Sequence, residues 1–243
     1  MSRPTIVPSL AEVLTRPAFI VERALASALE PLLVGAIKPG QVWLDVGCGQ
    51  RPYESLFAGA SYIGLDVADS GRAPGLKKAD VLYDGHTLPF PDAHAHGVLS
   101  TEVLEHVPNP ARYLAEAARV LKTGGALVLT VPFFWEQHEQ PFDFRRYTEF
   151  GLRRELEAAG FEIETLRKTA TGAETLAQGL SILLSGSVIS RVPFGRRLFL
   201  AALCAPIQLA GLALARVLPD RGDLFLNVVV LARKAPVRGS RRA

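Results

Sequence analysis

The chain has 243 residues, of which 49% are apolar and 21% are charged, so it can form a sizeable core and is not expected to be disordered throughout. Its net charge is only +3, and its central part carries no basic cluster, so we expect no nucleic acid among its partners. Cys48 and Cys204 lie far apart, which indicates no disulfide framework and fits a reducing compartment. No apolar run of signal-peptide length is present near residue 1, and we therefore expect a cytoplasmic protein.

Helices and strands alternate along the chain. Apolar residues recur at helical spacing over residues 16–37, where Pro31 interrupts the pattern and Lys38-Pro39-Gly40 predicts its end. Asn109 before Pro110 predicts the start of a helix over 110–121, and a further helix is expected over 148–159. Short apolar runs predict strands over 42–46, 61–66, 80–84, 97–100, 126–131 and 161–166. This order predicts an α/β fold with a mostly parallel sheet and helices on both faces.

Three acidic residues stand where successive strands end. The sequence Leu44-Asp45-Val46-Gly47-Cys48-Gly49 places a carboxylate and a glycine turn after the first strand, and Asp66 and Asp84 follow the next two. In open α/β sheets such positions share the ligand-binding rim, where a carboxylate can hold ribose hydroxyls. Dinucleotides and S-adenosylmethionine both fit. The third glycine of the dinucleotide fingerprint is missing after Gly49, so we favour S-adenosylmethionine.

From about residue 41 to 160 the chain resembles the class I S-adenosylmethionine-dependent methyltransferases, in particular the small-molecule branch often labelled type 11. The motifs are WLDVGCG (43–49), YIGLD (62–66), LPFPD (88–92), STEVLEHVPNP (100–110) and RVLKTGG (119–125). The resemblance implies a Rossmann-like sheet of seven strands whose last strand runs antiparallel between two others. It also implies cofactor-binding residues: Asp45, Gly47, Cys48 and Gly49 at the methionine part, Asp66 at the ribose, Asp84 and Gly85 at the adenine, and Ser100 and Thr101 beneath the sulfonium.

Aromatic, acidic and basic residues gather at 132–148, after the fifth strand, where we expect the acceptor pocket or a lid. His138 is the first candidate for a base or an acceptor-orienting group, and Asp143 is a further catalytic candidate; alternatively, His138 and Asp143 hold the loop together with Arg145 or Arg146. His106 is open to the same two interpretations, catalytic or structural. His94 and His96 form an HxH pair, but no cysteine or carboxylate spacing supports it, so we expect no metal.

Two uncharged runs, 175–190 and 198–215, precede the expected last strand, and arginines flank them. Three interpretations stay open for this hydrophobic helical insertion. Two helices could lie on a membrane face through 175–216, the insertion could be a buried cap or a homodimer interface, or, least favoured, it could span a membrane. Membrane contact at the inner face would favour a lipid-linked acceptor.

Together these features predict a single methyltransferase domain. Its segments are an N-terminal helical segment (1–40), a cofactor-binding core (41–170), the insertion (171–222), the last strand (223–234) and a basic tail (235–243). The expected activity is methyl transfer from S-adenosylmethionine to a small or lipid-linked acceptor, in cell-envelope, glycan or quinone biosynthesis. An NAD-dependent oxidoreductase and a non-catalytic membrane-associated protein are the alternatives.

Overall fold

The computed structural model describes residues 5–68, 78–186 and 196–236. Most of the predicted basic tail and the middle of the predicted insertion (187–195) lie outside these residues. The described chain forms a seven-stranded sheet in the order β3-β2-β1-β4-β5-β7-β6. The strands are β1 (Val42–Val46), β2 (Ser61–Val67), β3 (Val81–Tyr83), β4 (Ala95–Thr101), β5 (Leu121–Pro132), β6 (Phe161–Thr171) and β7 (Phe225–Lys234).

The pairing of the strands confirms the predicted topology. β1 to β5 are parallel, whereas β7 runs antiparallel to both of its neighbours, β5 and β6. The central strands are buried on both faces, which explains the nearly continuous apolar run of β5 and the equally apolar β7. Because β1, β2, β3 and β4 are parallel, the loops that follow them meet at one edge of the sheet.

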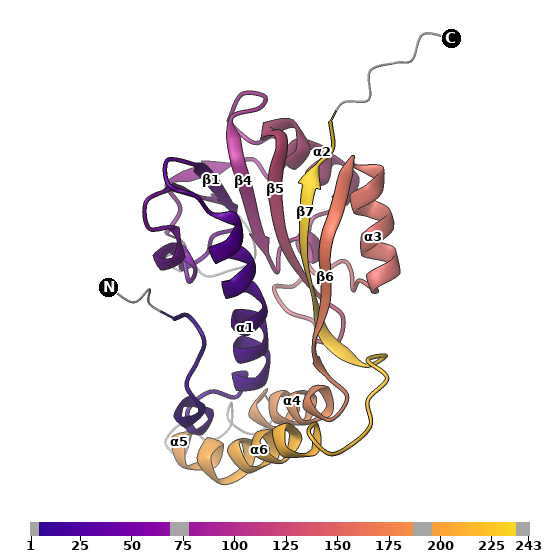
Figure 1. Ribbon diagram of the computed structural model, residues 1–243. Coiled ribbons are helices and arrows are strands. Elements are labelled where there is room, and N and C mark those ends of the chain that lie inside the picture. The colour runs from indigo at the N-terminus through magenta and orange to yellow at the C-terminus, as the bar shows by residue number, and fades with distance from the viewer. Residues whose placement is uncertain (1–4, 69–77, 187–195, 237–243) are drawn as a thin grey trace.

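Helices cover both faces of the sheet, as predicted (Figure 1). α2 (Pro110–Val120) and α3 (Glu149–Ala158) pack on one face, and α1 (Phe19–Ala36) packs on the other. Side-chain oxygens cap two of these helices: Asn109 accepts the N–H of Arg112, and Thr148 accepts the N–H of Gly151, both at 3.1 Å. Three short 3-10 turns, Leu10–Leu14, Glu54–Phe57 and Leu104–His106, complete this part of the fold.

α1 continues through Pro31, where the sequence indicated an interruption. Proline removes one backbone donor, so the carbonyl of Ser27, four residues earlier, loses its helical partner. Both Pro31 and Ser27 are exposed, and water can bond to that carbonyl. The opposite side of the helix buries Phe19, Leu29 and Leu33 against the sheet.

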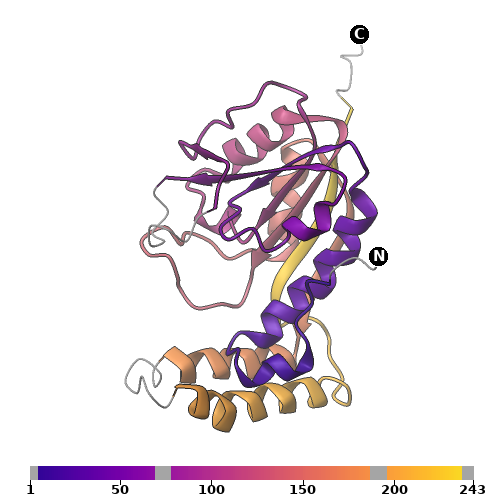
Figure 2. The ribbon, with the colours of Figure 1, turned by 90° about the vertical axis from the view of Figure 1, so that its left-hand side faces the viewer.

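The insertion forms a separate helical layer, here called the cap (residues 173–214). It consists of α4 (Ala173–Leu184), α5 (Arg196–Phe199), a π-helical turn (Leu200–Cys204) and α6 (Ala205–Leu214). β6 leads directly into α4, so the cap lies beyond the carboxyl ends of the parallel strands, the end at which the ligand rim was expected (Figures 1 and 2). No helix in the described ranges is long and apolar enough to span a membrane.

Two buried glutamines join the cap to α1. Gln178 accepts the N–H of Val21 at 3.1 Å and donates to the carbonyl of Pro17 at 2.8 Å. Gln208 accepts the N–H of Ile20 at 3.2 Å and donates to the carbonyl of Arg16 at 3.1 Å. The first N–H groups of a helix have no partner within it, and the cap supplies partners for two of them. The cap is therefore anchored through polar groups at its inner face.

Candidate functional site

The loop after β1 is shaped by glycine. Gly47 has φ +81°, and a Cβ added there would lie 2.3 Å from Cγ2 of Val103. The N–H groups of Gly47 and Cys48 both donate to the carbonyl of Leu65, at 2.8 and 2.9 Å, which ties this loop to β2. The backbone can therefore pass close to a bound molecule at a position where any side chain would collide with Val103.

Asp45, at the end of β1, is buried. Its Oδ2 accepts the hydroxyl proton of Tyr62, and no protein atom among the described residues bonds to its Oδ1. Burial raises the pKa of Asp45 to about 7. A buried carboxylate oxygen without a partner fits the ammonium group of a ligand, because a cation would offset the cost of its desolvation.

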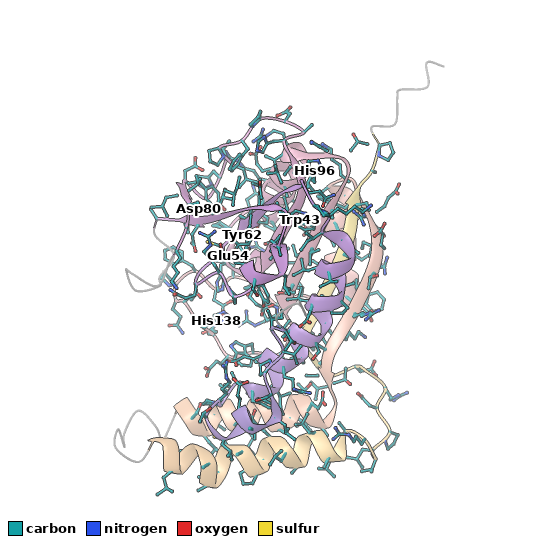
Figure 3. The ribbon with its side chains drawn as sticks, turned by 60° about the vertical axis from the view of Figure 1, so that its left-hand side comes forward. Trp43, Glu54, Tyr62, Asp80, His96 and His138 are labelled. Atoms are coloured by element: carbon teal, nitrogen blue, oxygen red, sulfur yellow. The ribbon has the colours of Figure 1, made fainter. Side chains whose placement is uncertain are left out.

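Several side chains that the sequence did not indicate surround Tyr62, the hydrogen-bond partner of Asp45. The Arg51 guanidinium lies 4.8 Å from the centre of the Tyr62 ring and forms ion pairs with Asp80 and Glu54, at 2.8 and 2.9 Å. Figure 3 shows Tyr62, Asp80 and Glu54 grouped on the same side of the sheet. Tyr62 lies 17 residues from Asp45, and Asp80 lies 29 residues from Arg51. No local motif could have indicated their contacts.

Asp66 and Asp84 lie at the ends of β2 and β3. Asp66 accepts the N–H of Gly49 at 3.2 Å and that of Val67 at 2.8 Å, through different carboxylate oxygens. Oδ1 of Asp84 accepts two backbone N–H groups, from His86 and Thr87, both at 2.8 Å, and these bonds lower the pKa of Asp84. Asp84 therefore also shapes the loop that follows it.

A cavity of about 210 Å³ lies at this edge of the sheet. Five of the residues predicted for the site line it, namely Gly47, Asp66, Asp84, Gly85 and His106. The other lining residues are Val67, Tyr83, His86, Glu102, Val103, Val107, Pro108, Glu139 and Phe142. Among the predicted residues, Asp45, Cys48, Gly49, Ser100, Thr101, His138 and Asp143 stand outside its lining.

Three of the residues expected at the cofactor have their side chains engaged elsewhere. The Ser100 hydroxyl is buried and bonds to Tyr113 of α2 at 2.7 Å, and Thr101 bonds to Tyr53. Cys48 is buried against Gly64, and burial raises the pKa of its thiol to about 12. Any contribution of these three residues to the ligand-binding floor would come from the backbone or from packing.

Glu102 is a cavity residue that the sequence analysis did not single out. It has φ +53°, which is uncommon for a residue other than glycine. Its carboxylate accepts hydrogen bonds from Thr130 at 2.7 Å and Asn227 at 2.8 Å, and burial raises its pKa to about 7. An unusual backbone conformation held by strand residues at a cavity wall is typical of a functional position. In the sequence, the only indication that Glu102 belongs to the site is its place just after β4, within the motif STEVLEHV.

The loop over residues 133–148 is fixed by an ion pair. Asp143 bonds to Arg146 through both carboxylate oxygens, at 2.6 and 2.8 Å, and accepts the N–H of His138 at 3.0 Å. Arg146 lowers the pKa of Asp143 to about 2. Arg145 donates to the carbonyls of Val107 and Pro108. In this arrangement Asp143 holds the loop, the structural role that the sequence left open.

His106 and His138 come together across this loop. Their Nε2 atoms are 3.1 Å apart, and the Glu105 carboxylate is adjacent, with Oε1 3.7 Å from Nε2 of His106. His94 and His96 are elsewhere: His94 stacks on Phe90, and His96 contacts Val42 and Lys122. Figure 3 shows His96 at the end of the sheet opposite to His138.

Comparisons with known proteins identify the family. A family model described as a methyltransferase domain matches residues 19–166, which is more than half of the chain. A probable S-adenosylmethionine-dependent methyltransferase from Mycolicibacterium smegmatis is 31% identical over 51% of this chain and 53% of its own length. An uncharacterized methyltransferase from Mycobacterium leprae is 38% identical over 40% of this chain and 39% of its own length. An uncharacterized protein of a Streptomyces fradiae transposon is 37% identical over 39% of this chain and 31% of its own length.

The chain therefore belongs to the methyltransferase domain family, and its fold is that of the class I enzymes, whose cofactor is S-adenosylmethionine. It spans 31 to 53% of the length of these curated relatives.

Solved structures share the fold. A putative methyltransferase from Bacillus halodurans matches with a TM-score of 0.53 and 21% identity, over 86% of this chain and 100% of its own. Geranyl diphosphate methyltransferase in complex with S-adenosylmethionine matches with a TM-score of 0.56 and 14% identity, over 93% and 95%. The cyclase SpnF also matches, with a TM-score of 0.53 and 22% identity, over 86% and 82%. Because a cyclase shares the fold, the reaction has to be argued from the residues of the site.

Proposed function

We propose that this protein transfers the methyl group of S-adenosylmethionine to a small or lipid-linked acceptor. The observation that carries the proposal is the composition of the cavity. Gly47, Asp66 and Asp84 line it and would take the cofactor, whereas Glu102 and His106 bring ionisable groups to the same space. When bound, S-adenosylmethionine supplies a methyl group on a positively charged sulfur, which is an effective leaving group.

On the cofactor side, each acidic residue has a role that its surroundings fit. Asp45 would accept the ammonium group through Oδ1, which lacks a partner among the described residues, while Tyr62 fixes the other oxygen. Asp66 would accept the ribose hydroxyls, and Asp84 with Gly85 would face the adenine. Much of the catalysis can then come from holding donor and acceptor in line and excluding water.

On the acceptor side, His106 is the residue best placed to act. It lies on the cavity wall, and its Nδ1 faces the carbonyl of Phe142 at 2.9 Å, so proton exchange would use Nε2, which lies 3.1 Å from Nε2 of His138. A base is required only if the acceptor loses a proton, as a hydroxyl group does. His138 contacts His106 and would act through it, as an orienting residue.

The cap supports the proposal of a lipid-linked acceptor, because it buries polar side chains and exposes leucines. Its inner face buries the polar residues Thr175, Gln178, Ser181 and Gln208 beside small apolar residues such as Ala177 and Ala205. On its outer side Leu176 and Leu183 are 61% and 62% exposed, and Leu180, between them on the same face of α4, is 45% exposed. Further exposed apolar residues follow on the second half of the insertion, namely Leu198, Leu203, Leu209, Leu214, Val217 and Leu218. Water-facing helices normally show the opposite pattern.

The charges along this segment of the sequence favour an anionic membrane. Between residues 175 and 219 the only charged residues are arginines, at positions 191, 196, 197 and 216. An apolar helical face with basic residues is typical of helices that lie in the headgroup region of a bilayer. We infer that the cap rests on the inner face of the cytoplasmic membrane, which agrees with a role in cell-envelope, glycan or quinone biosynthesis.

The cap is also connected to the acceptor loop. The ring of Phe134 packs against Gly179 of α4 so closely that an added Cβ would lie 2.7 Å from Cε1. His138 lies on this loop, between the sheet and the cap (Figure 3). A lipid-linked substrate held at the cap would therefore be close to the loop that carries His138.

Methyl transfer is tested by incubating the purified protein with S-adenosylmethionine labelled on its methyl group and with lipid or aqueous extracts of the source cells. The proposal predicts protein-dependent label in an extract, enriched in the lipid fraction. A protein that binds the cofactor but labels neither fraction would favour the non-catalytic alternative. A cofactor-dependent change in nicotinamide absorbance would favour the oxidoreductase.

Membrane contact is tested by flotation with vesicles of anionic phospholipid. The wild type should float, and the double substitution Leu180→Asp with Leu183→Asp should reduce flotation severalfold. Phe150→Asp is the matched control, because Phe150 is 76% exposed on α3, away from the cap. The membrane proposal would be contradicted if the wild type does not bind vesicles. If the wild type also sediments as a dimer and the cap variant as a monomer, the exposed leucines form a homodimer interface.

A further inference from the structure

Two histidine rings face each other beside an unpartnered buried carboxylate. The Nε2 atoms of His106 and His138 are 3.1 Å apart. Glu105 follows β4 in the chain and is fully buried, and neither of its carboxylate oxygens has a hydrogen-bond partner among the described residues. One oxygen or nitrogen atom from each of the three side chains lies within 4.8 Å of the other two.

The opposite ring nitrogens fix the protonation of both rings. Nδ1 of His106 lies 2.9 Å from the carbonyl oxygen of Phe142, and Nδ1 of His138 lies 3.2 Å from the carbonyl oxygen of Glu136. A carbonyl oxygen only accepts, so both Nδ1 atoms must donate. The two Nε2 atoms of the neutral rings then present lone pairs to each other, and this contact is repulsive unless a positive charge is shared between them.

The surroundings of the cluster favour a cation. The carboxylates of Glu102, Glu139 and Asp143 and the guanidinium of Arg146 are the charged groups that act on Glu105 or His106. Arg146 is already paired with Asp143 through both carboxylate oxygens. When these carboxylates are ionised, the charge around the cluster is therefore negative, and a cation would offset the cost of burying a carboxylate without a counter-charge.

We propose that Glu105, His106 and His138 bind a divalent transition-metal ion, of which Zn²⁺ is the first choice. Zinc prefers nitrogen donors at about 2.0 Å, and a tetrahedral arrangement then separates two such nitrogens by about 3.3 Å. The observed separations of 3.1 Å between the nitrogens and 3.7 Å between Nε2 of His106 and Oε1 of Glu105 are close to this spacing. Two imidazoles and one carboxylate form a donor set that metal ions of this class use with a fourth position open.

The orientation of both rings is that of metal ligands. Ligating histidines usually donate their second nitrogen to a backbone carbonyl or a carboxylate, and this bond fixes the lone pair that faces the ion. His106 does so to Phe142, and His138 does so to Glu136, with the Asp143 carboxylate 3.4 Å from the same nitrogen. The His138 side chain is 27% exposed and that of His106 13%, so the cluster can be reached from solvent.

The proposal that the ion binds does not depend on methyl transfer, but a role of the ion in catalysis rests on the proposed function. His106 lines the cavity, so the open position of the ion would be close to the acceptor. An oxygen atom of the acceptor bound there would lose its proton more readily. The ion would act as a Lewis acid on that oxygen, and the released proton would pass to the Glu102 carboxylate, which lines the same cavity, or to water, in place of His106.

The test uses tag-free, chelator-treated protein titrated with Zn²⁺ against a competing chelator, and with Co²⁺ followed by visible absorption. The wild type should bind one ion per chain, and the Co²⁺ complex should show the intense d–d bands of a four-coordinate site. Glu105→Gln, His106→Gln and His138→Gln should each weaken binding by at least about tenfold. His94→Gln is the matched control and should bind like the wild type, and thermal unfolding confirms that each variant is folded.

Two outcomes would overturn the proposal: a wild type that binds no stoichiometric ion, or binding that is equally strong in all three variants. Titration of S-adenosylmethionine into the same metal-free samples separates this inference from the methyltransferase proposal. A protein that binds the cofactor but no metal would contradict only the metal site. A protein that binds metal but no cofactor would contradict only the proposed methyl transfer.

Discussion

The backbone of Gly47 and the side chain of Val103 meet so closely that a Cβ added to the glycine would lie 2.3 Å from Cγ2 of Val103. Gly47→Ala should therefore abolish cofactor binding and lower the unfolding midpoint. Gly40→Ala is the matched control, because Gly40 has a similar φ of +76° and open space around it. It should cost only the conformational strain, about 1–2 kcal/mol. Adding Val103→Ala to Gly47→Ala should recover part of the lost stability, as a double-mutant cycle would measure. Equal effects of the two glycine variants would contradict a steric cause.

Cofactor affinity should depend on pH through Asp45. Its pKa is raised to about 7 by burial, and only the ionised form attracts an ammonium group. The affinity for the cofactor should reach its maximum above this pKa and fall by up to about tenfold per pH unit below it. Calorimetry in buffers of different ionisation enthalpy should detect proton release near neutral pH. Asp45→Asn should remove this release and the pH dependence. Glu102→Gln, which removes the other group with a pKa of about 7, should retain both. The opposite pattern would assign the pH dependence to Glu102.

The packing of the cap against α1 should depend on its two inward-facing glutamines. Gln178→Ala leaves the N–H of Val21 and the carbonyl of Pro17 without their partner, in a region where both glutamine side chains are fully buried. A loss of about 1–3 kcal/mol in unfolding free energy is expected from denaturant titration. Gln50→Ala, at an exposed position, should change little. If both variants were equally stable, the cap would not be anchored through these bonds.

The metal-free, cofactor-free protein should lose stability as pH rises from about 5 to about 8. Asp45, Glu102 and Glu105 all have pKa values raised by burial, so the folded state binds more protons than the unfolded state. The stabilisation from such groups is complete below their unfolded pKa and is lost as pH rises through the folded pKa. Glu105→Gln should therefore unfold a few degrees higher than the wild type at about pH 8, and by a smaller margin at about pH 5. A wild type whose unfolding temperature rises over this range would contradict the argument.

Local patterns in the sequence predicted most of the strands and helices, although β5 begins at Leu121 and not at residue 126, and the seven-stranded topology was implied by the resemblance. Asn109 and Thr148 cap the helices expected beside them, and β7 runs antiparallel as the resemblance implied. β6 extends to Thr171, beyond the predicted end at residue 166. It is an edge strand with charged residues such as Arg167 and Lys168 on its surface, so burial does not mark its end.

Contacts between distant residues could not be predicted. Tyr62 bonds to Asp45, and His138 meets His106, which lies 32 residues earlier. Only the folded chain brings these groups together. The uncharged runs indicated a helical insertion but did not indicate that Gln178 and Gln208 would face inward. In the sequence only the local pair His94 and His96 resembles a metal-binding pattern, whereas the proposed cluster joins the 3-10 turn after β4 to the loop after β5.

Calorimetric titration of S-adenosylmethionine into the purified protein, with Asp66→Ala alongside, tests most directly whether this cavity binds the cofactor. Asp66 lies on the cavity wall and holds the N–H of Gly49 at 3.2 Å. We expect the wild type to bind one cofactor per chain. The variant should remain folded and bind at least about tenfold more weakly, since the loss of hydrogen bonds to a charged group costs about 1.5–3 kcal/mol. No binding by a folded wild type, or equal binding by both proteins, would contradict this expectation.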